Sequence, residues 1–323
     1  MLFLALTLPP SLHAAAPAGA VAGWGDDVFG ELQVPAGLPP TVAVAGGSFR
    51  SLALLTNGTV AVWGNATVDQ IPPANLTNAT AVAAGGLFNL AIDSSLGVVA
   101  WGGQNAFGET NVPPNLGWPL AIGAGFNHGL AVTTNGSVVA WGDNSSGQTN
   151  VPTGLAGVVA VAGGFGHSLA LKGDGTVAAW GDNSQGQCSL PSNLTNVVAI
   201  AAGYYHNLAL VAGGGVVAWG RNDSGQAAVP PGLSNTVAIA AGESFSVALG
   251  ADGTLRAWGS QTNAGYGLTG GVSIAAGQSH GLVVTTPLAA FVTAQPASAS
   301  GIGGSPFALV AGALAPAGAG YHA

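Results

Sequence analysis

Short apolar runs separated by glycine, asparagine and aspartate recur along most of the chain. The unit is clearest from Val197, where Val-Val-Ala-Ile-Ala-Ala-Gly precedes Asn-Leu-Ala-Leu, a glycine turn and a run that ends in Trp219-Gly220. Runs of four to six residues rich in Val, Ile, Leu and Ala, bounded by Gly, Asn and Asp, are typical of β-strands. Each unit therefore predicts three antiparallel strands, and no helix start signal precedes a long pattern of period 3.6.

The turn between the second and third runs holds Asn-Gly or Asp-Gly in four units. These dipeptides are Asn57-Gly58, Asn135-Gly136, Asp174-Gly175 and Asp252-Gly253. Such pairs accept the positive φ angles of a two-residue hairpin turn. The sequence therefore predicts a two-residue β-hairpin at each of these positions.

The unit repeats at a nearly fixed period. Trp-Gly occurs seven times, and successive tryptophans are 39, 38, 40, 39, 39 and 39 residues apart. Repetition at one period indicates a copied supersecondary unit that buries its apolar face on its neighbours. We expect the tryptophans to pack between repeats, with the following glycine allowing a close turn. They are Trp24, Trp63, Trp101, Trp141, Trp180, Trp219 and Trp258.

The two ends of the repeat region are offset by part of a unit. The Trp-Gly strand comes first, at Trp24, whereas the segment of the first strand comes last, at 272–277. A ring that joins these two halves into one blade removes two exposed sheet edges. The prediction is an all-β, seven-bladed β-propeller over residues 21–284, with about three antiparallel strands per blade and a mixed closing blade from the N- and C-terminal segments.

The flanking segments lack the repeat. Residues 1–20 combine an apolar run with Ala14-Ala15-Ala16 and Ala18-Gly19-Ala20, the layout of a secretory signal peptide, although the run is short and no basic residue precedes it. The alternative is an apolar leader from a misassigned gene start. Residues 285–323 predict a linker or the truncated start of an immunoglobulin-like domain. We therefore expect a secreted or cell-surface protein.

Composition excludes several kinds of partner. The net charge is −8, with 4 Lys+Arg against 12 Asp+Glu, and the cations are scattered. Binding to nucleic acid or to an anionic membrane needs clustered Lys and Arg. No segment approaches the ~20 apolar residues of a spanning helix. A single cysteine, Cys188, rules out an intrachain disulfide.

The repeat resembles a known family. Ala-Ile-Ala-Ala-Gly-x-x-His-x-Leu-Ala-Leu, followed by Val-x-Ala-Trp-Gly-x-Asn-x-x-Gly-Gln-x-x-Val-Pro, is similar to the regulator-of-chromosome-condensation repeat, in its short bacterial form with a period near 40. The resemblance covers residues 21–284 and implies a propeller. Secreted propellers of the β-lactamase-inhibitory protein II type share this form, so the resemblance leaves inhibition of a β-lactamase open. It also leaves open guanine-nucleotide exchange, which is disfavoured because the chain has no basic tail.

The loop between the first and second strands is the candidate binding surface. In the resembled inhibitors, two variable columns of this loop form one aromatic face that grips the enzyme. Aromatic anchors also dominate binding hot spots in general. The alternative is that some of these rings fill the blade ends as core. The candidate residues are Phe49, Phe126, Phe165, Tyr204, Tyr205 and Glu243.

The next column holds four histidines, His128, His167, His206 and His280, beside Arg50 and two phenylalanines. A metal site would need donors about 2 Å from one ion, which residues on different radiating blades do not provide. We therefore expect a repeated structural hydrogen bond from each imidazole to a neighbouring backbone group, and no metal or cofactor. The turn at Asp143–Gln148 resembles a calcium loop but lacks the bidentate Glu.

No catalytic motif is present: the sequence has no Gly-x-Ser-x-Gly, no phosphate-binding loop and no His-Glu-x-x-His. The sequence therefore predicts a secreted, monomeric, non-catalytic propeller that presents a loop face to a protein or glycan partner.

Overall fold

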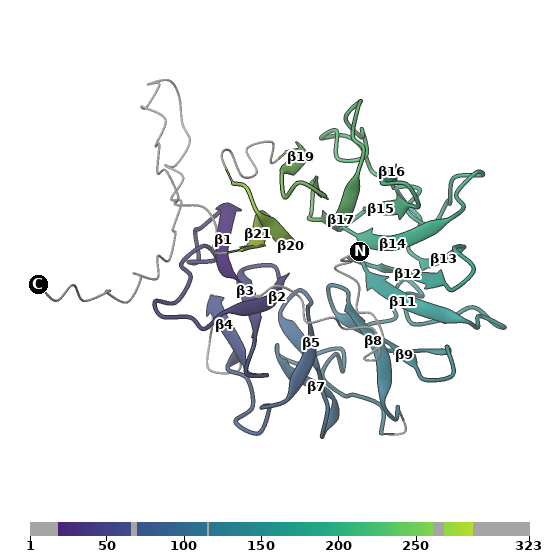
Figure 1. Ribbon diagram of the computed structural model, residues 1–323. Helices are drawn as coiled ribbons and strands as arrows, with labels where there is room; N and C mark the ends of the chain where they lie inside the picture. The colour runs from purple at the N-terminus through teal and green to yellow at the C-terminus, as the bar shows by residue number, and fades with distance from the viewer. Residues whose placement is uncertain (1–18, 66–69, 115, 261–267, 287–323) are drawn as a thin grey trace, which may run out of the picture.

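The computed structural model describes residues 19–65, 70–114, 116–260 and 268–286 (Figure 1). Most of the predicted signal peptide and of the predicted C-terminal tail lie outside these residues. The described chain forms twenty-one strands in seven three-stranded antiparallel sheets, arranged as blades around a common centre. The predicted all-β, seven-bladed propeller is confirmed.

Six blades are each made from three consecutive strands. Blade 1 is β2 (Thr41–Gly46), β3 (Arg50–Leu55) and β4 (Val60–Gly64); blade 2 is β5 (Ala79–Ala84), β6 (Phe88–Asp93) and β7 (Gly97–Gly102); blade 3 is β8 (Pro119–Ala124), β9 (His128–Thr133) and β10 (Val138–Gly142). Blade 4 is β11 (Val158–Gly163), β12 (His167–Lys172) and β13 (Val177–Gly181); blade 5 is β14 (Val197–Ala202), β15 (His206–Val211) and β16 (Gly215–Gly220); blade 6 is β17 (Thr236–Ala241), β18 (Phe245–Gly250) and β19 (Leu255–Gly259).

The closing blade combines both ends of the repeat region, as predicted. It has the strand order β1–β21–β20, from β1 (Ala20–Gly25), β20 (Gly271–Ala276) and β21 (His280–Thr285). The pairing of β1 with β21 runs from Ala20 opposite Thr285 to Gly25 opposite His280. The N-terminal strand thus takes the outer position that the Trp-Gly strand has in every other blade.

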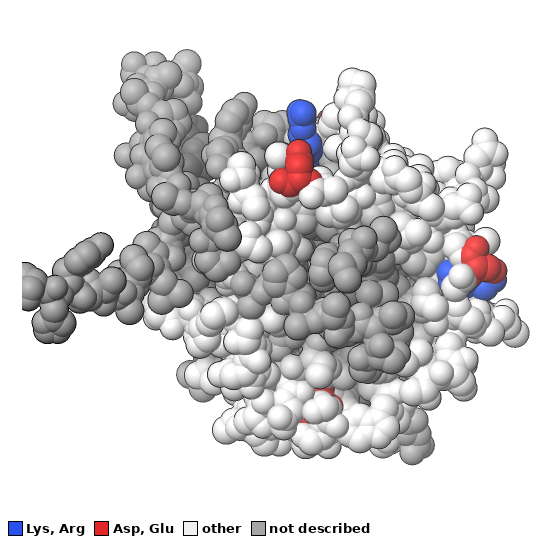
Figure 2. Space-filling view, viewed as in Figure 1, with Lys and Arg blue, Asp and Glu red and all other residues white. Residues whose placement is uncertain are grey.

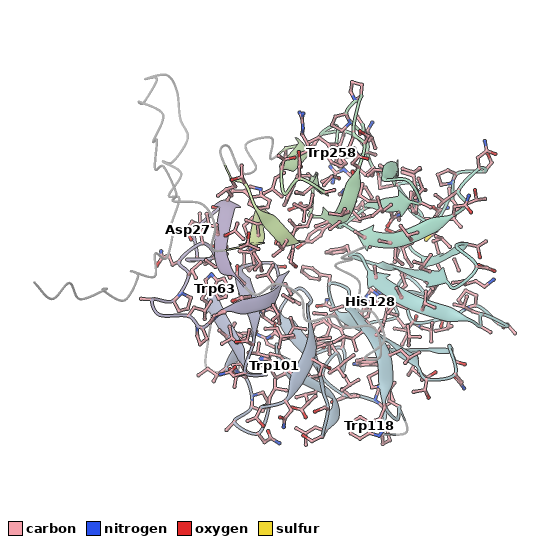
Figure 3. All side chains as sticks on the ribbon, in the orientation of Figure 1. Asp27, Trp63, Trp101, Trp118, His128 and Trp258 are labelled. Carbon is pink, nitrogen blue, oxygen red and sulfur yellow. The ribbon has the colours of Figure 1, made fainter. Side chains whose placement is uncertain are left out.

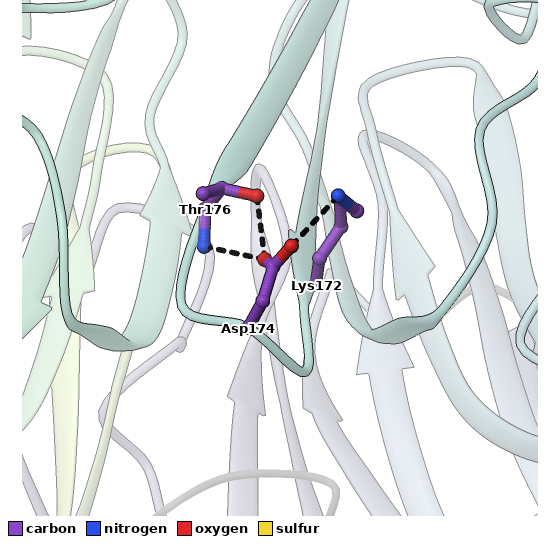
Figure 4. A network of polar contacts seen from close by, with 3 residues as sticks. All are labelled: Lys172, Asp174 and Thr176. Carbon is purple, nitrogen blue, oxygen red and sulfur yellow. Dashed lines mark hydrogen bonds and ion pairs between the residues drawn. The ribbon is translucent and has the colours of Figure 1, made fainter.

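The hairpin turns differ from the prediction in detail. At Asn57-Gly58 only the glycine has a positive φ, of 79°, and its N–H donates to the carbonyl of Leu55. This is a three-residue loop, in which a four-residue turn is followed by a left-handed glycine. In blade 4 the Asp174 carboxylate accepts from the N–H and hydroxyl of Thr176 and from Lys172 Nζ (Figure 4). The Asn or Asp is therefore needed for its side-chain acceptor, which stabilises the turn from inside.

The core lies between neighbouring blades. Trp180 is buried and packs in one cluster with Leu130 and Val132 of the preceding blade. Every glycine after a repeat tryptophan has a positive φ, between 84° and 101°, which a residue with a Cβ rarely adopts. Figure 3 shows Trp63, Trp101 and Trp258 at separate positions around the ring. Among the described residues, no helix has the length and apolar character needed to cross a membrane.

Candidate binding face

One end of the propeller carries the seven loops that join the first and second strands; we call this end the loop face. The Trp-Gly strand of each blade ends beside the same loop, as shown by the bond from Asp143 N–H to the Asn127 carbonyl, 2.9 Å. The hairpin turns lie at the other end of the strands, which we call the hairpin face. The two faces therefore carry different sets of side chains.

A closed ring of backbone hydrogen bonds links the seven loops. In each case an N–H of one blade donates to a carbonyl of the next. The bonds run from Ser48 to Gly86 (3.3 Å), Gly86 to Phe126 (2.8 Å), Phe126 to Gly164 (3.0 Å), Phe165 to Tyr204 (3.1 Å), Tyr204 to Gly242 (3.3 Å), Glu243 to Gln278 (3.0 Å) and Gln278 to Gly47 (3.1 Å). The loop backbones are thereby fixed relative to one another, so their side chains are presented on a rigid frame.

Each of these loops begins with a glycine, and in six of the seven blades this glycine has no room for a side chain. A Cβ on Gly164 would lie 2.1 Å from His167 Cε1 and 2.6 Å from the carbonyl oxygen of Gly203 in the next blade. The equivalent glycines of blades 3 and 5, Gly125 and Gly203, meet equally close atoms. Close approach of the blades, rather than a positive φ, is what requires glycine here.

The column of histidines forms hydrogen bonds from blade to blade. His128 Nε2 lies 2.9 Å from Ser168 Oγ, and His167 Nε2 lies 2.7 Å from Asn207 Oδ1, in each case one repeat further along. His206 bonds Ser246 in the same way, and His280 bonds Ser51 of blade 1. Arg50 replaces histidine in blade 1, and its Nε donates to Asn89 Oδ1 at 2.8 Å. The imidazoles are thus structural links between blades, but their Nε2 partners are Ser and Asn side chains rather than the backbone groups that the sequence predicts.

The protonation state of these histidines follows from their partners. Ser168 Oγ donates its hydrogen to the Gln148 carbonyl, which also accepts from Trp180 Nε1. His128 Nε2 must therefore carry a proton and donate to Ser168. Burial lowers the pKa of His128 to about 3, with the neighbouring His167 as a smaller cause. Burial also lowers the pKa of His206 and His280 to about 4.

A narrow cavity of about 80 Å³ lies between the inner strand ends, lined largely by glycine and alanine from all seven blades. On the loop face its wall includes Ser48, Phe126, Tyr204 and Gln278. This volume is below the few hundred Å³ of sites that enclose drug-sized ligands. A macromolecular partner would therefore contact the loop face rather than enter the centre.

Four predicted residues form one aromatic cluster, which we call the aromatic plate. It consists of Phe126, Phe165, Tyr204 and Tyr205, from three consecutive blades. The ring centroid of Phe165 lies 4.7 Å from that of Phe126 and 5.4 Å from those of Tyr204 and Tyr205. Phe165 is 37% exposed, and the other three rings are half-buried. The plate is thus partly packed and partly open to solvent.

Phe49 does not belong to this cluster. Its ring packs 4.8 Å from that of Phe29, which lies in the loop that follows β1. Phe29 is itself partly exposed, so the pair forms a second, smaller apolar contact. The structure therefore divides the predicted aromatic residues into two groups.

Tyr204 holds a polar chain across the centre of the loop face. Its hydroxyl lies 3.1 Å from Ser48 Oγ in blade 1 and donates to Gln278 Oε1 of the closing blade at 2.9 Å. Gln278 Nε2 in turn donates to Glu243 Oε2 of blade 6 at 3.0 Å. Burial raises the pKa of Tyr204 to about 12, so the phenol stays protonated and can donate. Glu243, predicted as a binding residue, is thereby joined to the plate through Gln278.

Ser48 and Gln278 were not among the predicted site residues. They occupy the same loop column as Phe126 and Tyr204, so their position was visible in the repeat. The sequence could not predict their contact with Tyr204, because a bond between blades 1 and 5 depends on the diameter of the ring.

In the loops that follow the Trp-Gly strands, polar side chains form hydrogen bonds within their own turn. The Asp182 carboxylate accepts from Ser184 N–H, Ser184 Oγ and Gln187 Nε2. Within the described ranges, no group of three or more His, Cys, Asp or Glu side chains is placed to hold a metal ion. Burial raises the pKa of the Cys188 thiol to about 11, which disfavours the reactive thiolate.

Comparison with known proteins supports the repeat assignment. The model of the regulator of chromosome condensation (RCC1) repeat matches residues 120–148, 158–187, 197–226 and 237–264, which lie in blades 3 to 6 and the loops after them. No curated protein matches the sequence.

Several solved structures share the fold. Prp20p from Saccharomyces cerevisiae is 19% identical, with a TM-score of 0.70, over 84% of this chain and 92% of that one. Human WBSCR16 is 19% identical, with a TM-score of 0.65, over 82% and 99% of the two chains. The CRINKLY WD40 ectodomain of the Arabidopsis thaliana receptor kinase ACR4 is 21% identical, with a TM-score of 0.59, over 74% and 90%. The chain therefore carries repeats of the regulator of chromosome condensation type within a seven-bladed β-propeller.

Proposed function

We propose that this protein is a secreted, monomeric, non-catalytic binding propeller whose loop face receives a protein or glycan partner. The observation that carries the proposal is the aromatic plate, in which three consecutive blades place Phe126, Phe165, Tyr204 and Tyr205 in mutual contact. Exposed aromatic rings on a rigid frame are the usual anchors of binding hot spots, since they bury a large area and have little freedom to lose.

The rigidity of the frame supports the same function. The ring of backbone bonds and the Tyr204 chain hold the plate before any partner arrives. Preorganisation lowers the entropy lost on binding. Binding to Gsp1p and histones is reported for Prp20p, which shares this fold. No described residue of the loop face favours β-lactamase inhibition or nucleotide exchange over other kinds of partner, so these narrower functions are not proposed.

The test removes exposed ring area without touching the polar chain. A Phe165→Ala/Tyr205→Ala variant keeps the Tyr204 hydroxyl and its partners, and we expect it to recover less of the partner than wild type from the native culture. Trp118→Ala is the matched control, because Trp118 is 55% exposed at the start of β8, on the hairpin face. Equal recovery by all three proteins would reject the loop face as the binding surface.

Secretion is tested by the N-terminus of the exported protein. Cleavage after Ala16 or after Ala20 would both follow a small-residue motif. Gly19, however, exchanges backbone hydrogen bonds of 3.0 and 2.9 Å with Thr41, and Ala20 begins β1. We therefore expect N-terminal sequencing of protein from the medium to find Gly19 retained. Protein found only inside the cell, with Met1 intact, would contradict export.

A further inference from the structure

The charged groups around the aromatic plate are mostly acidic. Asp182 lies beside Gly166, the residue after Phe165, because its backbone N–H donates to the Gly166 carbonyl at 2.8 Å. Burial is the main reason that the pKa of Tyr204 and of Tyr205 is raised. The charges of Asp182 and Glu243 also raise the pKa of Tyr205, while that of Arg221 lowers it, and the charge of Glu243 also raises the pKa of Tyr204. Asp182 follows blade 4 and Glu243 belongs to blade 6, so the two carboxylates flank the tyrosines of blade 5, which lies between them.

The hydrogen bonds of these two carboxylates come from neutral groups, although the charge of Glu243 also acts on Arg221 through space. Asp182 accepts from a backbone N–H, a hydroxyl and an amide, and Glu243 accepts from the Gln278 amide. Neutral donors hold a carboxylate in place without cancelling its charge. The negative potential over the plate is therefore available to a partner.

The four cations of the chain compensate this charge only in part. Arg50 is buried among the blade 1 and blade 2 loops, and Lys172 pairs with Asp174 on the hairpin face. Arg256 lies near the hairpin end of β19, beside Asp252. Arg221 does reach the plate, but its guanidinium pairs with Asp223 at 2.5 Å. On the face visible in Figure 2 the cations stand beside acidic side chains, and acidic atoms near the lower edge have no cation next to them.

Arg221 shows which chemistry suits these rings. Its guanidinium carbon lies 5.8 Å from the centroid of Tyr205 while its nitrogens face Asp223. A guanidinium that stacks on an aromatic ring and pairs with a nearby carboxylate gains from both interactions. The plate offers the same combination to an incoming group, with Phe165 and Tyr205 as the rings and Asp182 and Glu243 as the counter-charges.

We propose that the partner of the loop face is a protein segment that presents arginine or lysine together with an apolar side chain. This inference rests on the proposed function and narrows it to one class of partner. The apolar side chain packs on the aromatic plate, and the cation lies between the rings and the carboxylates. An acidic protein or acidic glycan is disfavoured by the same charges, because like charges across an interface oppose association.

In the experiment, peptides that bind the immobilised full chain are selected from a random library of twelve-residue peptides displayed on phage. We expect the recovered peptides to be enriched in Arg or Lys next to aromatic or aliphatic residues. The best peptide, labelled with a fluorophore, is then titrated against wild type and variants by anisotropy. We expect Phe165→Ala to weaken binding at least about tenfold, as the loss of a hot-spot ring does.

Two charge variants separate the inference from the proposed function. Glu243→Gln is compatible with the fold because Gln278 occupies the same loop column, and we expect it to weaken binding about threefold to tenfold. Asp174→Asn is the control on the hairpin face, where Asn57 and Asn135 occupy the same turn position, and we expect no change.

The outcomes differ for the two proposals. Neutral or acidic peptides that still depend on Phe165, or basic peptides indifferent to Glu243→Gln, would overturn the cationic partner and leave the binding face intact. A library that yields no peptide, or only peptides indifferent to Phe165→Ala, would count against both.

Discussion

The hydroxyl of Tyr204 lies 3.1 Å from that of Ser48, although 156 residues separate them in sequence. The contact joins blade 5 to blade 1 across the centre of the loop face, and Gln278 adds the closing blade. The two ends of the repeat region are joined by the noncovalent pairing of β1 with β21, so a bond across the centre adds a restraint to the closed ring.

Removing this hydroxyl tests its contribution. We expect Tyr204→Phe to lower the free energy of unfolding by about 1–2 kcal/mol, because two hydrogen bonds are lost and Gln278 Oε1 loses its donor. Urea denaturation measures the change. Tyr205→Phe is the control, since no hydrogen bond of its hydroxyl contributes to the described network; a similar loss in both variants would refute the special role of Tyr204.

The loop glycines make a second prediction. Gly164→Ala should lower the free energy of unfolding by roughly 3 kcal/mol, because its Cβ would lie 2.1 Å from His167 Cε1 and 2.6 Å from a backbone oxygen. Gly166→Ala, two residues away, meets its nearest atoms at 3.5 Å and should stay within about 0.5 kcal/mol of wild type. Equal thermal melting temperatures of the two variants would contradict this account.

The histidine column predicts that a substitution in one blade can be compensated by a second substitution at its hydrogen-bond partner in the next blade. Where the column holds Phe88 or Phe245, the partner position one repeat further holds Gly129 or Gly281 instead of Ser or Asn. There the tryptophan ring fills the space, since a Cβ on Gly129 would lie 2.4 Å from Trp141 Cε2.

We therefore expect His128→Phe and Ser168→Gly to destabilise the protein singly by about 1–3 kcal/mol each, because each leaves a buried polar group unpaired. The double variant should be less destabilised than the sum of the two, measured by a double-mutant cycle in urea. Strict additivity would show that the two positions are independent.

The same histidines predict a loss of stability in mild acid. Their folded-state pKa values lie below the ordinary value of 6.5, so the unfolded chain binds protons first as the pH falls. Their contribution is complete above pH 6.5 and is lost as the pH falls toward 4, at about 1.4 kcal/mol per pH unit for each histidine. Urea midpoints at several values between pH 7.5 and 4.5 measure this slope. The His128→Phe/Ser168→Gly variant should show a shallower slope; an unchanged slope would contradict the assignment.

The fold could be predicted because the residues that determine it recur at a nearly fixed period along the chain. Seven Trp-Gly pairs with offset ends determine both the number of blades and the mixed closing blade, and both follow from counting along the chain. The bonds from His128 to Ser168 and from His167 to Asn207 also join residues one period apart, so the pairing of His with Ser or Asn, and of Phe with Gly, was present in the repeat.

The candidate site was predictable only in part. The loop column identified Phe126, Phe165, Tyr204 and Tyr205, which meet because they lie on consecutive blades. The packing of Phe49 on Phe29 depends on the irregular loop after β1, and the bond of Tyr204 to Ser48 depends on the width of the ring. Neither quantity follows from residue spacing.

The closing blade also has a consequence for synthesis of the chain. β1 is made first, but its partner β21 is made last, and Ala20 and Thr285 are 265 residues apart. Domains are synthesised from the N-terminus, so β1 must wait with an unpaired edge while six blades form behind it. A ribosome that stops before β20 would release six complete blades and the unpaired strand β1, an open arc whose two ends can each pair with another chain.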